Sequence, residues 1–144
     1  MVNNYLNILI VDDDIEILDV YKIALEPGNF KCTTVKSPEK ALELYKSTSN
    51  SDKNKFDVVI TDIRMPEMSG FELLKQIKDI DKTARVIMMT GFNYFEIKNE
   101  VHLHQPYALL RKPFKLADLI SIFNKIEKEM RNEINNVIGV KNAK

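Results

Sequence analysis

Short apolar runs alternate with longer segments of helical periodicity along the whole chain, and this alternation limits the fold more than any other feature. The runs predict five strands, at Leu6–Val11, Phe30–Val35, Phe56–Ile60, Val86–Met89 and Tyr107–Leu110. Three of the runs are almost continuously apolar, as expected of strands that are covered on both faces. A strand followed by a helix, five times over, predicts an α/β fold with a parallel sheet between two helical layers.

The helical segments differ in clarity. The last is the clearest, because apolar residues recur three and four apart from Leu116 to Val137. The fourth, "FNYFEIKNEVHLHQP", is polar and poorly marked. Apolar spacing thins after Met130, so we expect one domain over residues 1–130. Residues 131–144 are expected to form a C-terminal helical extension or a disordered tail.

Charge and cysteine content exclude several classes of function. The 144 residues carry 21 basic and 21 acidic side chains, so the chain has no global basic field for nucleic acid or an anionic membrane. The single cysteine, Cys32, cannot form an intrachain disulfide. The opening "MVNNYLNILIVDDD" lacks the basic segment and the long apolar run of a targeting or membrane sequence. We therefore expect a cytoplasmic protein.

Charged and polar residues follow the predicted strands where each strand ends. The first strand runs into Asp12 and Asp13, the third into Asp62, the fourth into Thr90 and the fifth into Lys112. Ligands of open parallel sheets bind outside the carboxyl ends of the strands. Acids from two strands, a hydroxyl from a third and a cation from a fourth are therefore expected at one edge of the sheet.

Carboxylates gathered at one edge need a positive partner. Two unit charges about 4 Å apart repel by about 4 kcal/mol at an effective dielectric constant of about 20. One lysine cannot neutralise two or three acids, and a site of carboxylates, a backbone carbonyl and water favours Mg²⁺. A carboxylate beside such an ion can act as a nucleophile and form an acyl phosphate. Asp62 is the predicted acceptor, with Lys112 supplying charge and Thr90 a hydrogen bond.

Four motifs at these strand ends resemble the receiver domain of two-component response regulators. They are "ILIVDDD", "VVITDIRMPEMSGFELL", "VIMMTG" and "RKPF", in that order, and the resemblance runs from about Leu6 to Ile126. It implies a flavodoxin-like, three-layer αβα fold with strand order 2-1-3-4-5 and five helices, a strand order already known from chemotaxis receiver proteins. The chain resembles the stand-alone form of receiver found in chemotaxis.

The resemblance also assigns roles to the acidic residues. Asp62 lies where the family has its phospho-acceptor, and Asp12 and Asp13 match its acidic pair, with Asp13 favoured as the direct metal ligand. The backbone carbonyl of Arg64, two residues after the acceptor, matches the third protein ligand of Mg²⁺. The same residue places a long cationic side chain beside the site.

Further positions match the family at the fourth and fifth strands. Thr90 matches the switch hydroxyl and Lys112 the invariant cation, and Lys112-Pro113 resembles the family's cis peptide. One position departs from the pattern, because Leu109 lies where the family usually has a switching aromatic residue. Tyr107, two residues earlier, is a candidate substitute.

The resemblance implies a phosphoryl-accepting switch and not a conventional enzyme. A histidine kinase or phosphotransfer protein would donate the phosphoryl group, and the altered conformation would control an unknown downstream protein. A receiver fragment of a larger regulator and an unphosphorylated interaction module are alternatives. A metal-dependent phosphatase is a further alternative, although Asp62-Ile63-Arg64 lacks the second acid of the DxD motif that such hydrolases carry. The last helix could also provide the interface of a homodimer.

Other polar residues have structural explanations. Asp14 precedes a helical stripe and is expected to cap that helix. His102 and His104 lack further ligands in the sequence, so surface or helix-end positions are expected for them. The polar segment from Lys46 to Lys55 is expected to be a surface loop that tolerates insertion.

Overall fold

A computed structural model describes residues 4–137 of the chain, and strands and helices alternate throughout it. The strands are β1 (Leu6–Val11), β2 (Phe30–Val35), β3 (Val58–Asp62), β4 (Val86–Thr90) and β5 (Ala108–Arg111). The helices are α1 (Ile15–Leu25), α2 (Pro38–Thr48), α3 (Gly70–Ile80), α4 (Tyr94–His104) and α5 (Leu116–Val137). No helix within these residues is both long and apolar enough to cross a membrane.

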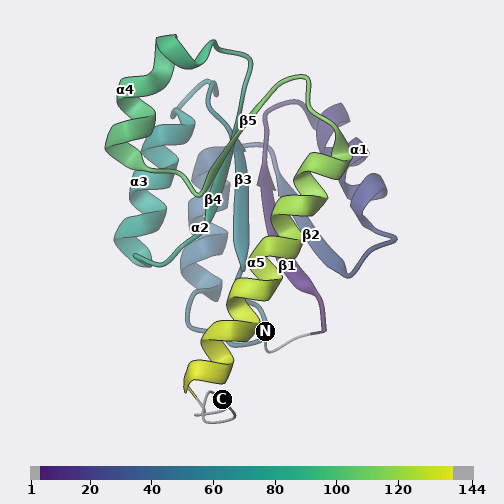
Figure 1. Ribbon diagram of the computed structural model, residues 1–144. Helices are drawn as coiled ribbons and strands as arrows, with labels where there is room; N and C mark the ends of the chain where they lie inside the picture. The colour runs from purple at the N-terminus through teal and green to yellow at the C-terminus, as the bar shows by residue number, and fades with distance from the viewer. Residues whose placement is uncertain (1–3, 138–144) are drawn as a thin grey trace.

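The five strands form one parallel sheet of order β2-β1-β3-β4-β5. Helices α1 and α5 cover one face of the sheet and α2, α3 and α4 the other, which gives three layers (Figure 1). The predicted flavodoxin-like fold with five helices is therefore confirmed. Because every strand runs in the same direction, the carboxyl ends of all five lie at one edge.

Each face of the sheet has its own apolar core. On the α1–α5 side, Leu119, Phe123 and Ile126 of α5 are completely buried against side chains of the central strands. On the other side, α3 contributes the largest share, with Leu73, Leu74 and Ile77 also fully buried. Burial on both faces explains the nearly continuous apolar runs of β1, β3 and β4.

Strands β1 and β2 have the predicted bounds, and the bounds of the other three strands differ from the predicted ones by one or two residues. Strand β3 begins at Val58, two residues later than predicted, and continues through Asp62. Phe56 is buried but lies before the sheet pairing, so an apolar side chain alone does not mark the start of a strand. Strand β5 is shifted by one residue, although the amide of Tyr107 still donates to the carbonyl of Val86.

Helix α4, the poorly marked one, is stabilised at its ends rather than by a broad apolar face. Asn93 and Glu96 form a capping box at its start. Its C-cap residue, Gln105, adopts a left-handed conformation with φ of 49°, and Lys78 of α3 donates to the carbonyls of His104 and Gln105. Ile97 is the only buried residue of this helix, so the helix packs lightly.

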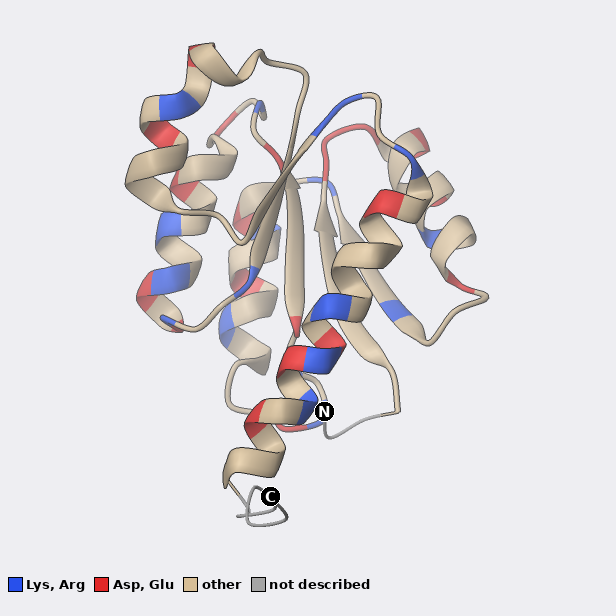
Figure 2. Cartoon of the chain, in the orientation of Figure 1, with Lys and Arg blue, Asp and Glu red and all other residues tan. Residues whose placement is uncertain are grey.

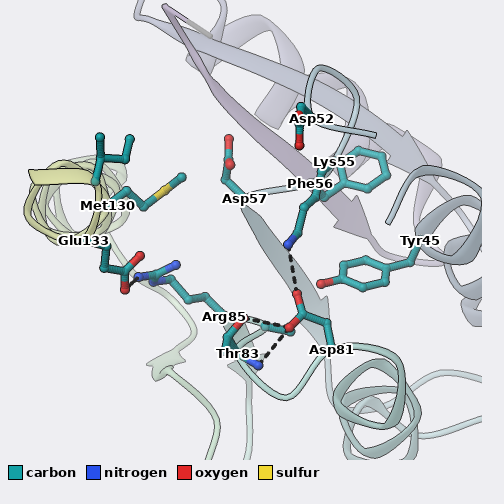
Figure 3. A pocket seen from close by; sticks show the side chains of 12 residues that line it. Tyr45, Asp52, Lys55, Phe56, Asp57, Asp81, Thr83, Arg85, Met130 and Glu133 are labelled. Carbon is teal, nitrogen blue, oxygen red and sulfur yellow. Dashed lines mark hydrogen bonds and ion pairs between the residues drawn. The ribbon is translucent and has the colours of Figure 1, made fainter. Parts of the chain in front are cut away.

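Ion pairs line a cavity of about 290 Å³ at the amino edge of the sheet (Figure 3). This edge lies opposite the carboxyl ends of the strands. Arg85, just before β4, pairs with Glu133 at 2.9 Å and with Glu129 at 3.4 Å, and both acids belong to α5. On the other side of the cavity Lys55 pairs with Asp81 at 3.3 Å. These contacts fix α5 beyond Met130, and residues 138–144 of the predicted extension lie outside the described residues.

A buried asparagine ties the loop after α2 to the sheet. Asn7 of β1 is 3% exposed, and its side-chain amide donates to the carbonyls of Asn54 and Lys55. Its backbone amide donates to Asp57 Oδ2 at 2.7 Å. The exposed loop is therefore anchored at its C-terminal end, and insertions are expected to be tolerated only before Asn54.

Asp57 should make the protein less stable at neutral pH than an uncharged side chain would. Burial raises the pKa of Asp57 above its usual 3.8, although the Asn7 amide and the charges of Arg85 and Lys55 act in the opposite direction. Because the pKa is higher in the folded state than in the unfolded state, protonation of Asp57 stabilises the fold. This contribution is fully present at pH values below the unfolded-state pKa. That contribution is lost as pH rises through the folded-state pKa.

The variant Asp57→Asn keeps an oxygen acceptor for Asn7 and removes the titration. We expect it to be more stable than the unsubstituted chain at about pH 7, with the difference disappearing near about pH 4. Urea unfolding at several pH values measures this difference. Parallel stability curves over the whole range would contradict the expected effect.

Candidate functional site

Of the side chains that the sequence assigned to one edge of the sheet, Asp62 and Lys112 are in direct contact, and Asp12 lies close enough to interact with the charges of both. Acidic residues after β1 and β3 and basic residues after β5 gather at the carboxyl edge of the sheet (Figure 2). The closest contact joins the Nζ atom of Lys112 to Oδ2 of Asp62 at 2.8 Å. Burial alone would lower the pKa of Lys112, but the hydrogen bond and charge of Asp62 and the charge of Asp12 raise it. Lys112 is therefore held in its charged form.

Asp12 is the most buried acid of the group. It is 1% exposed, its Oδ1 accepts from the amide of Asp14, and its Oδ2 has no hydrogen-bond partner. Burial raises the pKa of Asp12, and the negative charges of Asp62 and Asp13 act in the same direction, against Lys112. A buried carboxylate oxygen without a partner is costly. A cation coordinated by it, or by a water bound to it, would satisfy this atom, so these residues fit Mg²⁺.

Asp13 and the backbone carbonyl of Arg64 are the remaining predicted ligands. Asp13 is exposed, and Arg64 follows Asp62 by two residues, with its backbone amide donating to Asp62 Oδ1 at 3.3 Å. Among residues 4–137 no three Asp, Glu, His or Cys side chains form a ready-made metal cluster. A metal at this edge would therefore depend on the Arg64 carbonyl and on water as well as on carboxylates.

Thr90 and Lys112 are linked through the backbone. The Thr90 hydroxyl, at the end of β4, is buried and accepts a hydrogen bond from the amide of Phe92 at 2.8 Å. The carbonyl of Thr90 accepts from the amide of Lys112 at 2.7 Å. The peptide between Lys112 and Pro113 is cis, as the resemblance implied. These contacts fix the hydroxyl and the cation relative to each other.

A cavity of about 330 Å³ lies in front of the acceptor candidate. Its lining consists of five residues, Asp62, Arg64, Gly91, Phe92 and Lys112. A Cβ atom added to Gly91 would meet nothing within 4 Å, so the cavity is open beside this glycine. A group the size of a phosphoryl could therefore reach the Asp62 carboxylate.

Tyr107, the candidate substitute for the switching aromatic residue, is held in place by a hydrogen bond to α5. Leu109 is partly buried and packs on the core of the α3 side. The hydroxyl of Tyr107 donates to Oε1 of Glu129 on α5 at 2.9 Å, and burial together with Glu129 raises the pKa of Tyr107 to about 12. Tyr107 thus joins β5 to α5 at the amino edge, far along the strand from the acidic tips.

Three aromatic residues near the site were missed from the sequence. The ring of Tyr21 in α1 stacks on Phe114. Burial raises the pKa of Tyr21, the charge of Lys112 lowers it and that of Asp12 raises it. Phe92 lines the cavity. Tyr21 looked like one more member of the apolar stripe of α1. Phe92 follows Thr90 by two residues, as Arg64 follows Asp62, and this matching offset was the available signal.

Several secondary predictions are confirmed. Asp14 caps α1 through its side chain, which accepts from the amides of Glu16 and Ile17. His102 and His104 lie in the last turn of α4, where His104 stacks on Phe71.

Comparison with known proteins shows the family. The model of the response regulator receiver domain matches residues 8–124. The chain belongs to this family. It is 32% identical over 134 residues to the heme response regulator HssR of Staphylococcus saprophyticus, covering 93% of this chain and 57% of that regulator. It covers only 19% of the Arabidopsis thaliana response regulator ARR2, so this receiver spans less than two thirds of both relatives.

Solved receiver structures agree with this assignment. A response regulator receiver domain from Clostridium thermocellum is 33% identical, with a TM-score of 0.76 over 87% of this chain and 97% of that one. The regulator TrrA of Thermotoga maritima, solved in complex with Mg²⁺ and BeF, is 27% identical, with a TM-score of 0.70 over 84% of this receiver and 98% of that chain. Receiver domains in general bind Mg²⁺, accept phosphoryl groups and interact with histidine kinases and downstream targets.

Proposed function

We propose that this receiver is a switch activated by phosphorylation of Asp62. A histidine kinase or phosphotransfer protein donates the phosphoryl group in a Mg²⁺-dependent reaction, and the altered conformation controls a protein partner. The contact of 2.8 Å between Lys112 and Asp62, at the floor of an open cavity, carries this proposal.

In the proposed reaction, a phosphoryl group passes from the imidazole nitrogen of the donor to a carboxylate oxygen of Asp62. A carboxylate oxygen of Asp62 attacks the phosphorus of a phosphohistidine. The P–N bond breaks, its electron pair returns to the imidazole nitrogen, and a new P–O bond forms the acyl phosphate. Lys112 offsets the charge of the phosphoryl oxygens, which is the main task of a protein in such a transfer.

Mg²⁺, when bound, would neutralise further phosphoryl charge and orient the group for transfer. We propose Asp12, Asp13 and Asp62, with the carbonyl of Arg64, as the residues that hold it. The partnerless buried oxygen of Asp12 supports this assignment, because a cation at the acidic edge gives that oxygen a counter-charge.

Thr90 is proposed as the residue that responds to phosphorylation of Asp62. A hydroxyl that accepts one hydrogen bond can still donate its own proton, here to a phosphoryl oxygen. Moving Thr90 toward the phosphoryl group would pull on the amide of Phe92 and thereby on the start of α4. Catalysis by this chain would be limited to its own phosphorylation and dephosphorylation.

The wider setting is also a proposal. A location in the cytoplasm is consistent with the single cysteine. Output is expected through protein contacts and not through nucleic acid or membrane, and a homodimer through the last helix stays a prediction. Since both relatives are longer than this chain, the same switch could serve an attached effector domain.

Beryllofluoride, a mimic of the phosphoryl group, provides a direct test. We expect the chain to bind it in the presence of Mg²⁺, with NMR shifts centred on the residues around Asp62 and Thr90, and to release it when EDTA removes the metal. Mass spectrometry after incubation with acetyl phosphate should show one added phosphoryl group. A chain that takes up neither would instead be an unphosphorylated interaction module.

A further inference from the structure

Lys112 lines two separate cavities. One is the cavity in front of Asp62, and the other is a groove of about 460 Å³ between α1 and the segment that follows β5. Tyr21 of α1 lines this groove together with Lys112, Pro113 and Phe114. The lysine that pairs with Asp62 therefore also borders α1, so a side chain of α1 can affect where its ammonium group lies.

Tyr21 is fixed from two directions. Its hydroxyl donates to the sulfur of Met89 at 3.2 Å, and its ring stacks on the ring of Phe114 with the two planes 5° apart. Met89 is completely buried in β4 and is paired with Asp62 in the sheet. Phe114 follows Lys112 by two residues. The tyrosine is thus attached both to the strand beside the acceptor and to the segment that carries the lysine.

The contact with Met89 determines which part of the phenol a cation would meet. A thioether sulfur carries no proton, so Tyr21 must be the donor, and the lone pairs of its oxygen stay available. Burial raises the pKa of Tyr21, although the charge of Lys112 acts in the opposite direction, so the phenol is un-ionised at neutral pH. Tyr21 therefore offers a neighbouring cation an oxygen with a negative partial charge.

Lys112 needs more than Asp62 to keep its ammonium group in place. The side chain of Lys112 is 31% exposed, and a lysine ends on a flexible four-carbon stem. A partly exposed ion pair contributes little to holding such a side chain. Phosphoryl transfer depends on charges that are already positioned when the group arrives. A second contact that keeps the ammonium beside the carboxylate would therefore speed the reaction.

Building on the function proposed above, we propose that Tyr21 is a positioning residue for the phosphorylation of Asp62. Its phenol oxygen attracts the Lys112 ammonium from the side of the groove. Its ring, held by Met89 and Phe114, limits the conformations of the lysine stem. In this role Tyr21 contacts neither the phosphoryl group nor its donor, and the bonds made and broken are those of the transfer described above.

The first test is the initial rate at which the full chain takes up the phosphoryl group of radiolabelled acetyl phosphate with Mg²⁺. Tyr21→Phe keeps the ring and loses the oxygen, so we expect a rate about threefold lower. Tyr21→Leu loses both and should be about tenfold slower. Tyr45→Phe is the matched control, because it removes a buried tyrosine hydroxyl beside Asp81 at the amino edge, and its rate should be unchanged.

The second test observes Lys112 itself, by proton–nitrogen correlation NMR of the lysine ammonium groups at low temperature. Its signal is assigned by its loss in Lys112→Arg. An ammonium group that is held in place exchanges its protons with water slowly, so we expect a signal that weakens in Tyr21→Phe and persists in Tyr45→Phe. A general loss of stability would not change this signal selectively.

Either a rate or an ammonium signal that is the same in Tyr21→Phe as in the unsubstituted chain would overturn the inference while leaving the proposed function intact. A Lys112 ammonium that exchanges as fast as those of the exposed lysines in the unsubstituted chain would overturn it as well, because the lysine would then not be held. An unsubstituted chain that takes up no phosphoryl group overturns both proposals.

Discussion

Replacing Asp62 by asparagine is expected to abolish phosphorylation while the chain stays folded. Asparagine has the same shape but lacks the anionic oxygen that attacks phosphorus. Incorporation from acetyl phosphate with Mg²⁺ should therefore fall by at least about 10²-fold, to background. The ion pair with Lys112 is partly exposed, and its loss is offset by relief of repulsion with Asp12, so stability should change by less than about 1 kcal/mol.

Asp19→Asn is the matched control for Asp62→Asn. Asp19 is an exposed acid of α1, and its substitution removes the same charge away from the carboxyl edge. It should accept the phosphoryl group as the unsubstituted chain does. If Asp62→Asn were labelled to the same extent, another residue would be the acceptor and the proposed site would be wrong.

Gly70→Ala should be among the most destabilising small substitutions in the chain. Gly70 is buried at the start of α3, and its amide donates to the carbonyl of Ile63. An added Cβ would press on the carbonyl oxygen of Asp62 and lie 3.0 Å from the Cα of Ile63 and 2.8 Å from the Cε of Met88. The methionine end can move, but the backbone atoms cannot move without displacing the acceptor.

We expect Gly70→Ala to cost about 2–3 kcal/mol, or about 5–10 °C in Tm. It should also weaken beryllofluoride binding, because the backbone of Asp62 is part of the collision. Gly91→Ala is the control, since its Cβ would meet open space, and it should change stability by less than about 0.5 kcal/mol. Equal Tm values for the two variants would show that the helix start adjusts freely.

The sheet and its charged edge could be predicted because both depend on local pattern and on one rule of topology. Continuous apolar runs mark strands that are buried on two faces, and parallel strands bring their carboxyl ends together. Asp62 and Lys112 are 50 residues apart in the sequence, yet each lies two residues after the end of an apolar run. Their contact follows from that placement.

Other features depend on packing between distant elements, which the local pattern does not contain. The poorly marked pattern of α4 did not indicate which of its apolar residues faces the core: Phe95 is 76% exposed, whereas Ile97 is buried. Packing against the core on the α3 side decides which residue is buried. Likewise, the matching offsets of Arg64 and Phe92 from Asp62 and Thr90 place both residues near the site, but they do not show that the guanidinium lies on the ring.

The ion pairs of Arg85 make the attachment of the distal turns of α5 sensitive to salt. Glu133 is 66% exposed and Glu129 37%, so dissolved salt can screen their attraction to Arg85. The screening length falls from about 10 Å at 0.1 M to about 3 Å at 1 M ionic strength. Concentrated salt should therefore loosen the distal turns of α5 and speed amide exchange there. The apolar packing of Phe123 and Ile126 would keep the proximal turns in place.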